Sequence, residues 1–285
     1  TLTNMYRILR AMPLRRPILL EGPPGVGKTS IITNLAKITG HKLVRINLSE
    51  QSELSDLLGT DIPTSNTEDS DVDAEGVKKK KGKFVWNDGV FLAAMRRGDW
   101  VLLDELNLAP QSVLEGLNAC FDHRGEVFIP EIGQTVKCPP SFRVFCAQNP
   151  MGSGGGRKGL PQSFLSRLAR VYVDSMTEAD VLEIVQETFS ATLHPLLRAY
   201  IPLLVRFMYQ LQEDIVLKGK FGHNGSPWEF NLRDLYRLFQ ILQVRCPNMN
   251  SDTYLMNDEM LQRHVGEAVY LVFMCRMRTA GDRDQ

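Results

Sequence analysis

The chain has 285 residues, with 33 basic and 33 acidic side chains and 43% hydrophobic residues. This composition is ordinary for a globular protein and argues against a disordered, collagen-like or disulfide-rich chain. The balanced charge gives no general attraction to nucleic acid or to an anionic membrane, so we expect neither as a direct partner.

The cysteines are five in number and widely spaced, and no two of them form a C-x-x-C pattern: Cys120, Cys138, Cys146, Cys246 and Cys275. Neither a disulfide framework nor a zinc site is indicated, and a reducing compartment fits best. No run of eighteen apolar residues and no signal-peptide pattern occurs, so nothing suggests a membrane span or export. Because the chain starts at Thr1 and reaches its first motif within thirty residues, we expect it to be a segment of a longer protein.

Short apolar runs alternate with helical patterns over the first part of the chain. Runs of the length of buried strands lie at residues 18–20, 43–48, 100–103, 142–147 and 171–173. This alternation predicts βα units and a mainly parallel sheet whose strands are buried on both faces. We therefore expect an α/β domain over residues 1–175.

From Thr177 onward the pattern is helical, which predicts a smaller all-helical domain over residues 176–285. Two apolar stripes at helical spacing carry this prediction: Leu232, Leu235, Leu238, Phe239 and Leu242, and then Leu261, Val265, Val269 and Val272. Pro195 and Pro202 interrupt an apolar stretch, which predicts a short turn followed by a helix that starts near Pro202.

Residues 59–83 have an unusual composition, in which five acids are followed by five lysines. The acids lie at positions 68, 69, 71, 73 and 75, and the lysines at positions 78–81 and 83. Two interpretations stay open: a solvated flexible loop whose charges neutralise each other, or a docking surface for a partner.

The sequence GPPGVGKTS at residues 22–30 follows an apolar strand and precedes a helical pattern. This context and the G-x-x-x-x-G-K-T spacing predict a phosphate-binding loop for ATP or ADP with Mg²⁺. The glycines allow consecutive N–H groups to point at a phosphate, Lys28 adds a positive charge, and the Thr29 hydroxyl is a ligand for Mg²⁺. The candidate nucleotide-binding residues are Gly22, Pro23, Pro24, Gly25, Val26, Gly27, Lys28, Thr29 and Ser30.

The strand at 100–103 ends in Asp104 and Glu105, which places two carboxylates at the edge of the sheet where ligands of parallel sheets bind. We expect Asp104 to hold Mg²⁺ and Glu105 to polarise the attacking water. An Asp-Glu pair is also a common start of a helix, and a helix is predicted over residues 107–121, so both interpretations can hold together.

The strand at 142–147 is followed by Asn149, which we expect to donate to the γ-phosphate or to orient the water. An Asn-Pro turn made with Pro150 is the structural alternative, and it is compatible with the functional one.

Phosphoryl transfer is accelerated by a positioned arginine, and the chain offers two candidates. Arg167 is predicted at the far side of the sheet from the phosphate loop, where it would reach the nucleotide of a neighbour. Arg233 would sit in the first turn of a helix capped by Asn231, where a cation is disfavoured unless an anion is near. That anion is either Asp234 or a nucleotide phosphate.

Arg157 and Lys158 either contact a neighbouring subunit or belong to a solvated loop.

Several longer segments of the sequence resemble those of a known family: GPPGVGKTS, LLDELNLAPQSVLEGLNACFDHRGEVFIPE, FCAQNP, GGGRKGLPQSFLSRLARVYVD and EFNLRDLYR. Together they resemble the AAA+ ATPase domains of the dynein-related clade, and in particular those of a very large ribosome-assembly ATPase. The resemblance spans about residues 4 to 280.

The resemblance implies a five-stranded αβα core, a helical lid and six such domains joined as a ring within one polypeptide. It matches residues 22–29 to Walker A, Asp104 and Glu105 to Walker B, Asn149 to sensor 1, Arg167 to the arginine finger and Arg233 to sensor 2. It also matches residues 59–86 to a helix-2 insertion, residues 126–137 to a hairpin insertion and Asn47 to a polar switch for the catalytic glutamate.

In function, the resemblance implies a Mg²⁺-dependent ATPase module that remodels pre-60S ribosomal particles in the nucleus. Its partners would be neighbouring AAA+ domains, the pre-60S particle and assembly factors. Two alternatives stay open: a ring member that holds nucleotide without turnover, and another remodelling motor of the MoxR-like or helicase-like kind. A DNA-handling hairpin would need a basic or aromatic tip, which the charges Glu126, Glu131 and Lys137 do not indicate.

Overall fold

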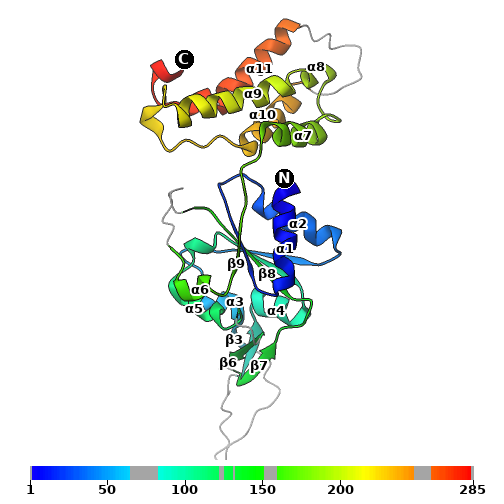
Figure 1. Cartoon of the computed structure of the whole chain (residues 1–285), viewed down its shortest axis with the longest axis vertical. Helices are drawn as coiled ribbons and strands as arrows, with labels where there is room; N and C mark the ends of the chain where they lie inside the picture. Colours follow the sequence, from blue (N-terminus) through cyan, green and yellow to red (C-terminus); the bar gives the residue numbers. More distant parts are fainter. Residues whose placement is uncertain are drawn as a thin grey trace, which may run out of the picture. The chain divides into compact units, whose positions relative to one another are not determined.

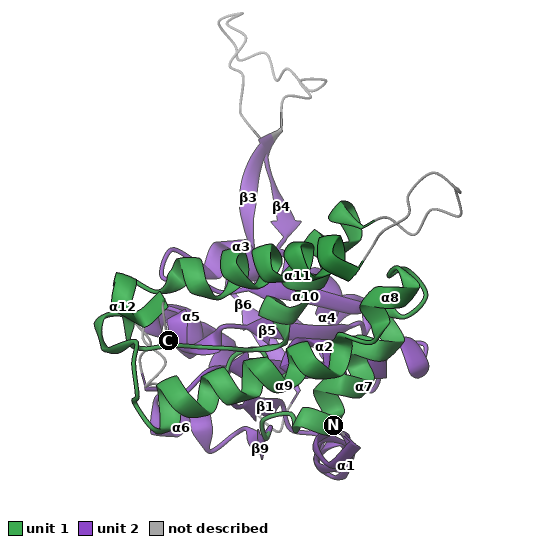
Figure 2. Ribbon diagram, turned by 90° about the horizontal axis from the view of Figure 1, so that it is seen from above, with its two compact units in different colours: residues 1, 23–26, 174–285 green, residues 2–22, 27–173 purple. Residues whose placement is uncertain are grey.

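The computed structural model describes residues 2–64, 83–121, 125–130, 132–150, 159–246 and 258–283. The chain divides into two compact units (Figures 1 and 2). The sheet unit comprises residues 2–22 and 27–173, and the helical unit comprises residues 23–26 and 174–285. Across the parts of the chain so described, no helix has the length and apolar character needed to cross a membrane.

Five parallel strands form the sheet, in the order β2-β5-β8-β1-β9. The strands are β1 (Ile18–Glu21), β2 (Leu43–Asn47), β5 (Trp100–Asp104), β8 (Arg143–Gln148) and β9 (Ala169–Tyr172). The predicted parallel sheet is thus confirmed, and every one of its strands comes from a predicted apolar run. Strand β9 begins at Ala169 rather than at residue 171, because Ala169 and Arg170 pair with the first residues of β1.

Helices connect the strands of the sheet unit and pack against them. They are α1 (Leu2–Ala11), α2 (Lys28–Ile38), α3 (Leu54–Leu58), α4 (Val90–Arg97), α5 (Gln111–Asn118) and α6 (Gln162–Leu165). Helix α2 contacts β5 and β8, α4 contacts β5 and β2, and α1 contacts β9. Apolar residues of α3, α4, α5 and α6 and of strands β1, β2, β5 and β8 share a core, in which Leu19, Phe91 and Leu103 are fully buried.

The helix predicted over residues 107–121 is wrong in its extent. A 3-10 turn (Leu106–Leu108) comes first, the chain is extended at Ala109 with a ψ of 143°, and α5 begins only at Gln111. The reason is Pro110, whose ring disfavours the helical conformation of the residue before it.

Two antiparallel hairpins project from the sheet unit, one in each of the predicted insertions. The first joins β3 (Gly59–Thr64) to β4 (Lys83–Asp88), and the second joins β6 (Glu126–Ile129) to β7 (Gln134–Lys137). The stretch at 59–83 was predicted as a loop or docking surface; residues 65–82 of it lie outside the described residues, whereas residues 59–64 and Lys83 belong to the paired strands and are not loop.

The described part of the helical unit contains helices and no strand. The helices are α7 (Glu178–Phe189), α8 (Pro195–Arg198), α9 (Ile201–Gln212), α10 (Leu232–Arg245), α11 (Asp258–Val272) and α12 (Ala280–Arg283), with 3-10 turns at His223–Gly225 and Met274–Arg276 and a π turn at Glu213–Leu217. The start of α9 agrees with the prediction from Pro202, whereas the predicted turn at Pro195 is a single helical turn. The predicted stripes face a shared core, in which Leu235, Leu238 and Phe239 are fully buried.

Candidate functional site

The candidate site lies at the carboxyl edge of the sheet, where three neighbouring strands end. Strand β1 leads into the phosphate loop, β5 ends in Asp104, and β8 is followed by Asn149. Since β5, β8 and β1 are adjacent and parallel, the residues after them meet at one edge.

Glycine is required in the loop between β1 and α2. Gly25 and Gly27 have φ values of 78° and 81°, which side chains with a Cβ rarely adopt. A Cβ on Gly22 would lie 2.3 Å from the backbone oxygen of Val173. Pro23–Val26 form the tip of the loop, and α2 begins at Lys28 directly after Gly27. This is the strand–loop–helix arrangement in which backbone N–H groups bind phosphate.

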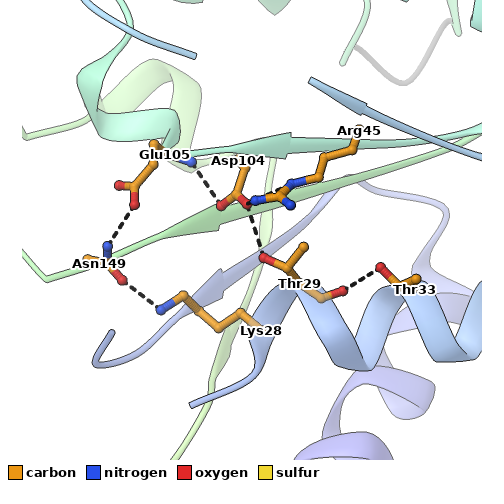
Figure 3. Close-up of polar contacts among 7 residues, drawn as sticks. All are labelled: Lys28, Thr29, Thr33, Arg45, Asp104, Glu105 and Asn149. Carbon is orange, nitrogen blue, oxygen red and sulfur yellow. Dashed lines mark hydrogen bonds and ion pairs between the residues drawn. The ribbon is translucent and has the colours of Figure 1, made fainter. Parts of the chain in front are cut away.

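Lys28 and Asn149 are buried and bonded to each other at the mouth of the loop (Figure 3). The Lys28 Nζ donates to Asn149 Oδ1 at 2.8 Å and to the Gly22 carbonyl at 2.7 Å. The Asn149 Nδ2 donates to Glu105 Oε1 at 3.0 Å. One amide therefore links the predicted phosphate-binding lysine to the predicted water-activating carboxylate.

Asn107 fixes the backbone that carries this amide. Its Nδ2 donates to the Asn149 carbonyl at 2.9 Å, and the residue is 2% exposed. Asn107 was predicted only as part of a helix, so this positioning contact was missed. No local sequence pattern predicts this contact, because the two residues are 42 positions apart in the chain.

Thr29 and Asp104 lie together on the other side of the site. The Thr29 hydroxyl donates to Asp104 Oδ2 at 3.0 Å, and the Glu105 N–H donates to Asp104 Oδ1. A hydroxyl and a carboxylate are hard oxygen ligands, which is the donor set that Mg²⁺ prefers. The two residues therefore fit the predicted metal site.

Arg45 of β2 also binds Asp104, which the sequence analysis did not predict. Its Nη2 and Nε lie 2.6 Å and 3.1 Å from Asp104 Oδ2, the same oxygen that Thr29 contacts. The register explains the contact, because β2 pairs with β5 up to Asn47 opposite Asp104. The presence of a cation, Arg45, inside the apolar run at 43–48 could have indicated that a carboxylate lies nearby.

Glu105 has a left-handed backbone, with φ of 55° and ψ of 45°. Such a conformation costs a non-glycine residue about 1 kcal/mol or more and is often found at functional sites. It ends β5 abruptly and starts the 3-10 turn at Leu106–Leu108.

Asn47 does not take part in this arrangement. Its side chain is exposed, and it has no hydrogen bond to Glu105 within the ranges that the structure describes. In the described chain, the polar partner of Glu105 is Asn149 instead.

The predicted arginines lie elsewhere. Arg167 precedes β9 and so lies at the amino edge of the sheet, where its Nη1 donates to the Asn118 carbonyl. Arg233 lies on α10 of the helical unit and is exposed. Arg157 and Lys158 lie outside the described residues.

Asp234 does not neutralise Arg233. Its carboxylate accepts from the Asn231 N–H and forms ion pairs with Arg237 and Arg276. Asn231 caps α10 as predicted, since its Oδ1 accepts from the Arg233 N–H at 2.9 Å. No described residue forms a hydrogen bond or ion pair with the Arg233 guanidinium, so the interpretation in which Asp234 relieves it is wrong.

Comparison with known proteins gives consistent matches along the chain. A family model described as "AAA domain (dynein-related subfamily)" matches residues 17–168, and one described as "Midasin AAA lid domain" matches residues 180–285. The chain is 46% identical to midasin of Dictyostelium discoideum over 285 residues and 42% identical to midasin of Giardia intestinalis over 282 residues.

These alignments cover 100% and 99% of this chain but only 4% and 5% of the two midasins. The chain therefore spans a small fraction of the length of these relatives. A crystal structure of a protein from Cytophaga hutchinsonii has a TM-score of 0.46 and 23% identity, over 66% of this chain and 56% of that chain.

Proposed function

The chain belongs to the dynein-related subfamily of AAA domains, and on that premise we propose that it binds ATP with Mg²⁺ and hydrolyses the bond to the γ-phosphate. The observation that carries the proposal is the hydrogen-bonded row Lys28–Asn149–Glu105 beside the Thr29–Asp104 pair. A domain that only binds nucleotide would need Lys28 and the loop, but it would not need the Glu105 carboxylate held next to them.

Binding of the triphosphate falls to the loop and to Lys28. The backbone N–H groups of the loop and of the first turn of α2, which includes Ser30, donate to the oxygens of the β-phosphate. The Lys28 ammonium, now held by Gly22 and Asn149, turns to the β and γ oxygens.

Thr29 and Asp104 would hold Mg²⁺, Thr29 directly and Asp104 through water. When bound, Mg²⁺ neutralises charge on the β and γ oxygens. Asp104 must then give up its contact with Arg45, whose side chain is 54% exposed and free to move toward solvent.

Glu105 and Asn149 act on the attacking water. The Glu105 carboxylate polarises the water and takes its proton as the new O–P bond forms, and ADP leaves with the electron pair of the broken bond. The Asn149 Nδ2, which donates to Glu105 Oε1, orients the carboxylate and donates to the γ-phosphate as charge develops.

The arginines that complete the reaction come from outside this edge of the sheet. We assign Arg167 to the nucleotide of a neighbouring domain, because it lies at the amino edge of its own sheet. Arg233 serves a nucleotide phosphate, its own or a neighbour's, since its guanidinium is exposed and Asp234 is bound to other arginines.

The surrounding assembly is proposed from similarity to the midasins. We propose a ring of AAA+ domains within one longer polypeptide, acting in the nucleus to remodel pre-60S ribosomal particles with their assembly factors. The match of residues 180–285 to a midasin lid supports this over a MoxR-like motor.

The direct test is Glu105→Gln in the full ring. We expect ATP turnover to fall at least tenfold while the affinity for ATP changes by less than threefold, because the substitution removes the base and keeps the shape. The matched control is Glu115→Gln, which changes an exposed carboxylate on α5. Turnover that survives Glu105→Gln, or that falls equally in the control, would contradict the assignment.

Two alternatives make different predictions. A ring member that only holds nucleotide would show no steady turnover attributable to this domain. A DNA-handling motor would bind DNA in a salt-sensitive way; the hairpin at 126–137 exposes Phe128 but has Lys137 as its only basic residue.

A further inference from the structure

A second polar cavity lies within the sheet unit, at the amino edge of the sheet. Its volume is about 420 Å³, and its walls come from the segments before β1, β8 and β9 and after α5. Because the strands are parallel, this edge is opposite to the one that carries Lys28 and Asp104. The cavity is therefore separate from the proposed ATP site.

Four arginines line this cavity: Arg15, Arg16, Arg143 and Arg167. Arg167 donates to the Asn118 carbonyl, which is a neutral acceptor. Over the described ranges, none of the four guanidiniums forms an ion pair with a carboxylate. Elsewhere in the sheet unit arginines do find carboxylates, as Arg96 does at Asp88 and Arg97 at Asp99.

The charge of Arg15 acts on Arg143 within this cavity. Burial lowers the pKa of the Arg143 guanidinium, and the charge of Arg15 lowers that pKa further. Arginine nevertheless stays protonated in proteins, so the repulsion remains. Arg15 ends the 3-10 turn Met12–Leu14 with a left-handed backbone, φ of 52°, and its N–H donates to the Met12 carbonyl. Four arginines that line one cavity without a described carboxylate indicate a site for something anionic.

Among the lining residues that the structure describes, none supplies negative charge. Burial raises the pKa of Cys120 to about 12 and that of Cys138 to about 11, so both thiols are neutral near pH 7. The remaining lining is made of prolines, aliphatic residues, Phe121, Phe142, Gly125 and Ser166.

We propose that this cavity binds a polyphosphate group, with Arg15, Arg16 and Arg143 as its principal ligands. A pyrophosphate or triphosphate tail concentrates several negative charges in a volume this cavity can hold, and the guanidinium fork matches phosphate oxygens in bidentate geometry. A single carboxylate would leave most of the positive charge unpaired. The group comes either from a free polyphosphate anion or from the tail of a nucleotide held by another copy or domain.

The first experiment titrates pyrophosphate into the Lys28→Ala chain by isothermal calorimetry, so that the phosphate loop does not contribute. We expect binding that weakens at least tenfold on Arg15→Gln and on Arg143→Gln. Arg170→Gln, which removes an exposed arginine of β9 outside the cavity, should change the affinity by less than twofold. Thermal unfolding of each variant verifies that it is folded, and the exposed Arg15 keeps the test valid if Arg143→Gln does not fold.

The second experiment distinguishes the two sources. Sedimentation of the chain with an intact Lys28 is measured with and without ATP; ATP-dependent association that Arg15→Gln abolishes identifies a nucleotide held by another copy. Pyrophosphate binding without such association identifies a free anion. If pyrophosphate does not bind and ATP-dependent association is insensitive to Arg15→Gln, or if polyglutamate binds and pyrophosphate does not, the proposal is overturned. Since the calorimetry uses a chain with a disabled phosphate loop, its failure leaves the proposed ATPase function untouched.

Discussion

At the residue scale, the most informative contact is the one between Arg45 and Asp104. Three donors, the Arg45 Nη2 and Nε and the Thr29 hydroxyl, converge on Asp104 Oδ2. The carboxylate that we propose as a Mg²⁺ ligand is thus already bound to a cation. The guanidinium and the proposed metal would compete for the same oxygen.

Arg45→Ala should therefore raise the affinity of the ADP-bound chain for Mg²⁺. A half-exposed ion pair contributes about 0.2–1 kcal/mol, so its removal should tighten metal binding by about 1.4- to 5-fold. A Mg²⁺ titration of the fluorescence of bound nucleotide analogue measures this change. Arg97→Ala is the matched control, because it breaks the pair with Asp99 and leaves Asp104 alone. Metal affinity that falls in Arg45→Ala would mean that Arg45 supports the metal site instead.

At the element scale, two helices of the helical unit begin at side-chain caps. Helix α7 begins at Thr177 with a capping box: the Thr177 hydroxyl accepts from the Asp180 N–H, and the Asp180 carboxylate accepts from the Thr177 N–H. Helix α10 begins in the same way at Asn231 and Asp234. Both boxes were legible in the sequence as a polar residue followed three positions later by an acid.

Thr177→Ala should lower the free energy of unfolding of the helical unit by about 1 kcal/mol, since it leaves an N–H of the first turn without its acceptor. Urea unfolding followed by circular dichroism provides the measurement. Thr188→Ala removes an exposed hydroxyl that donates to the Ile184 carbonyl within the same helix and lies 3.5 Å from the Tyr236 hydroxyl, and it should be close to neutral. Equal destabilisation by both changes would show that the cap is not the cause.

Elements that depend on local patterns were predictable, and those that depend on distant contacts were not. The strands of the sheet appear in the sequence as short apolar runs, and the phosphate loop as a fixed spacing with a strand before it and a helix after it. The break before α5 was missed because the apolar spacing outweighed Pro110 in the prediction. Asn107 and Arg45 were missed because their partners lie 42 and 59 positions away in the chain.

At the scale of the whole molecule, the two edges of the sheet carry different chemistry. The carboxyl edge holds the loop, both carboxylates and Asn149, whereas Arg167 lies at the amino edge. In the proposed function, one copy would therefore present a nucleotide site and, on its opposite edge, an arginine for the site of another copy. A domain alone should bind nucleotide but hydrolyse it slowly.

Complementation tests this arrangement. A Lys28→Ala copy supplies Arg167 but binds no ATP, and an Arg167→Ala copy binds ATP but supplies no arginine. Each alone should turn over ATP at least tenfold more slowly than the unchanged chain at the same concentration, and a mixture should exceed the sum of the two. If the Arg167→Ala copy alone matches the unchanged chain at every concentration, Arg167 does not act between copies.

Because Lys28 is hydrogen-bonded to Asn149, binding of a phosphate to Lys28 would replace one hydrogen bond by another. The Lys28 ammonium already donates to the Gly22 carbonyl and to Asn149 Oδ1. A triphosphate would therefore compete with Asn149 Oδ1 for the ammonium. Breaking the hydrogen bond between Lys28 and that amide lowers the net affinity for the triphosphate. The same amide donates to Glu105 Oε1, so in the proposed mechanism the binding of phosphate in the loop would reach the proposed base through the movement of one side chain.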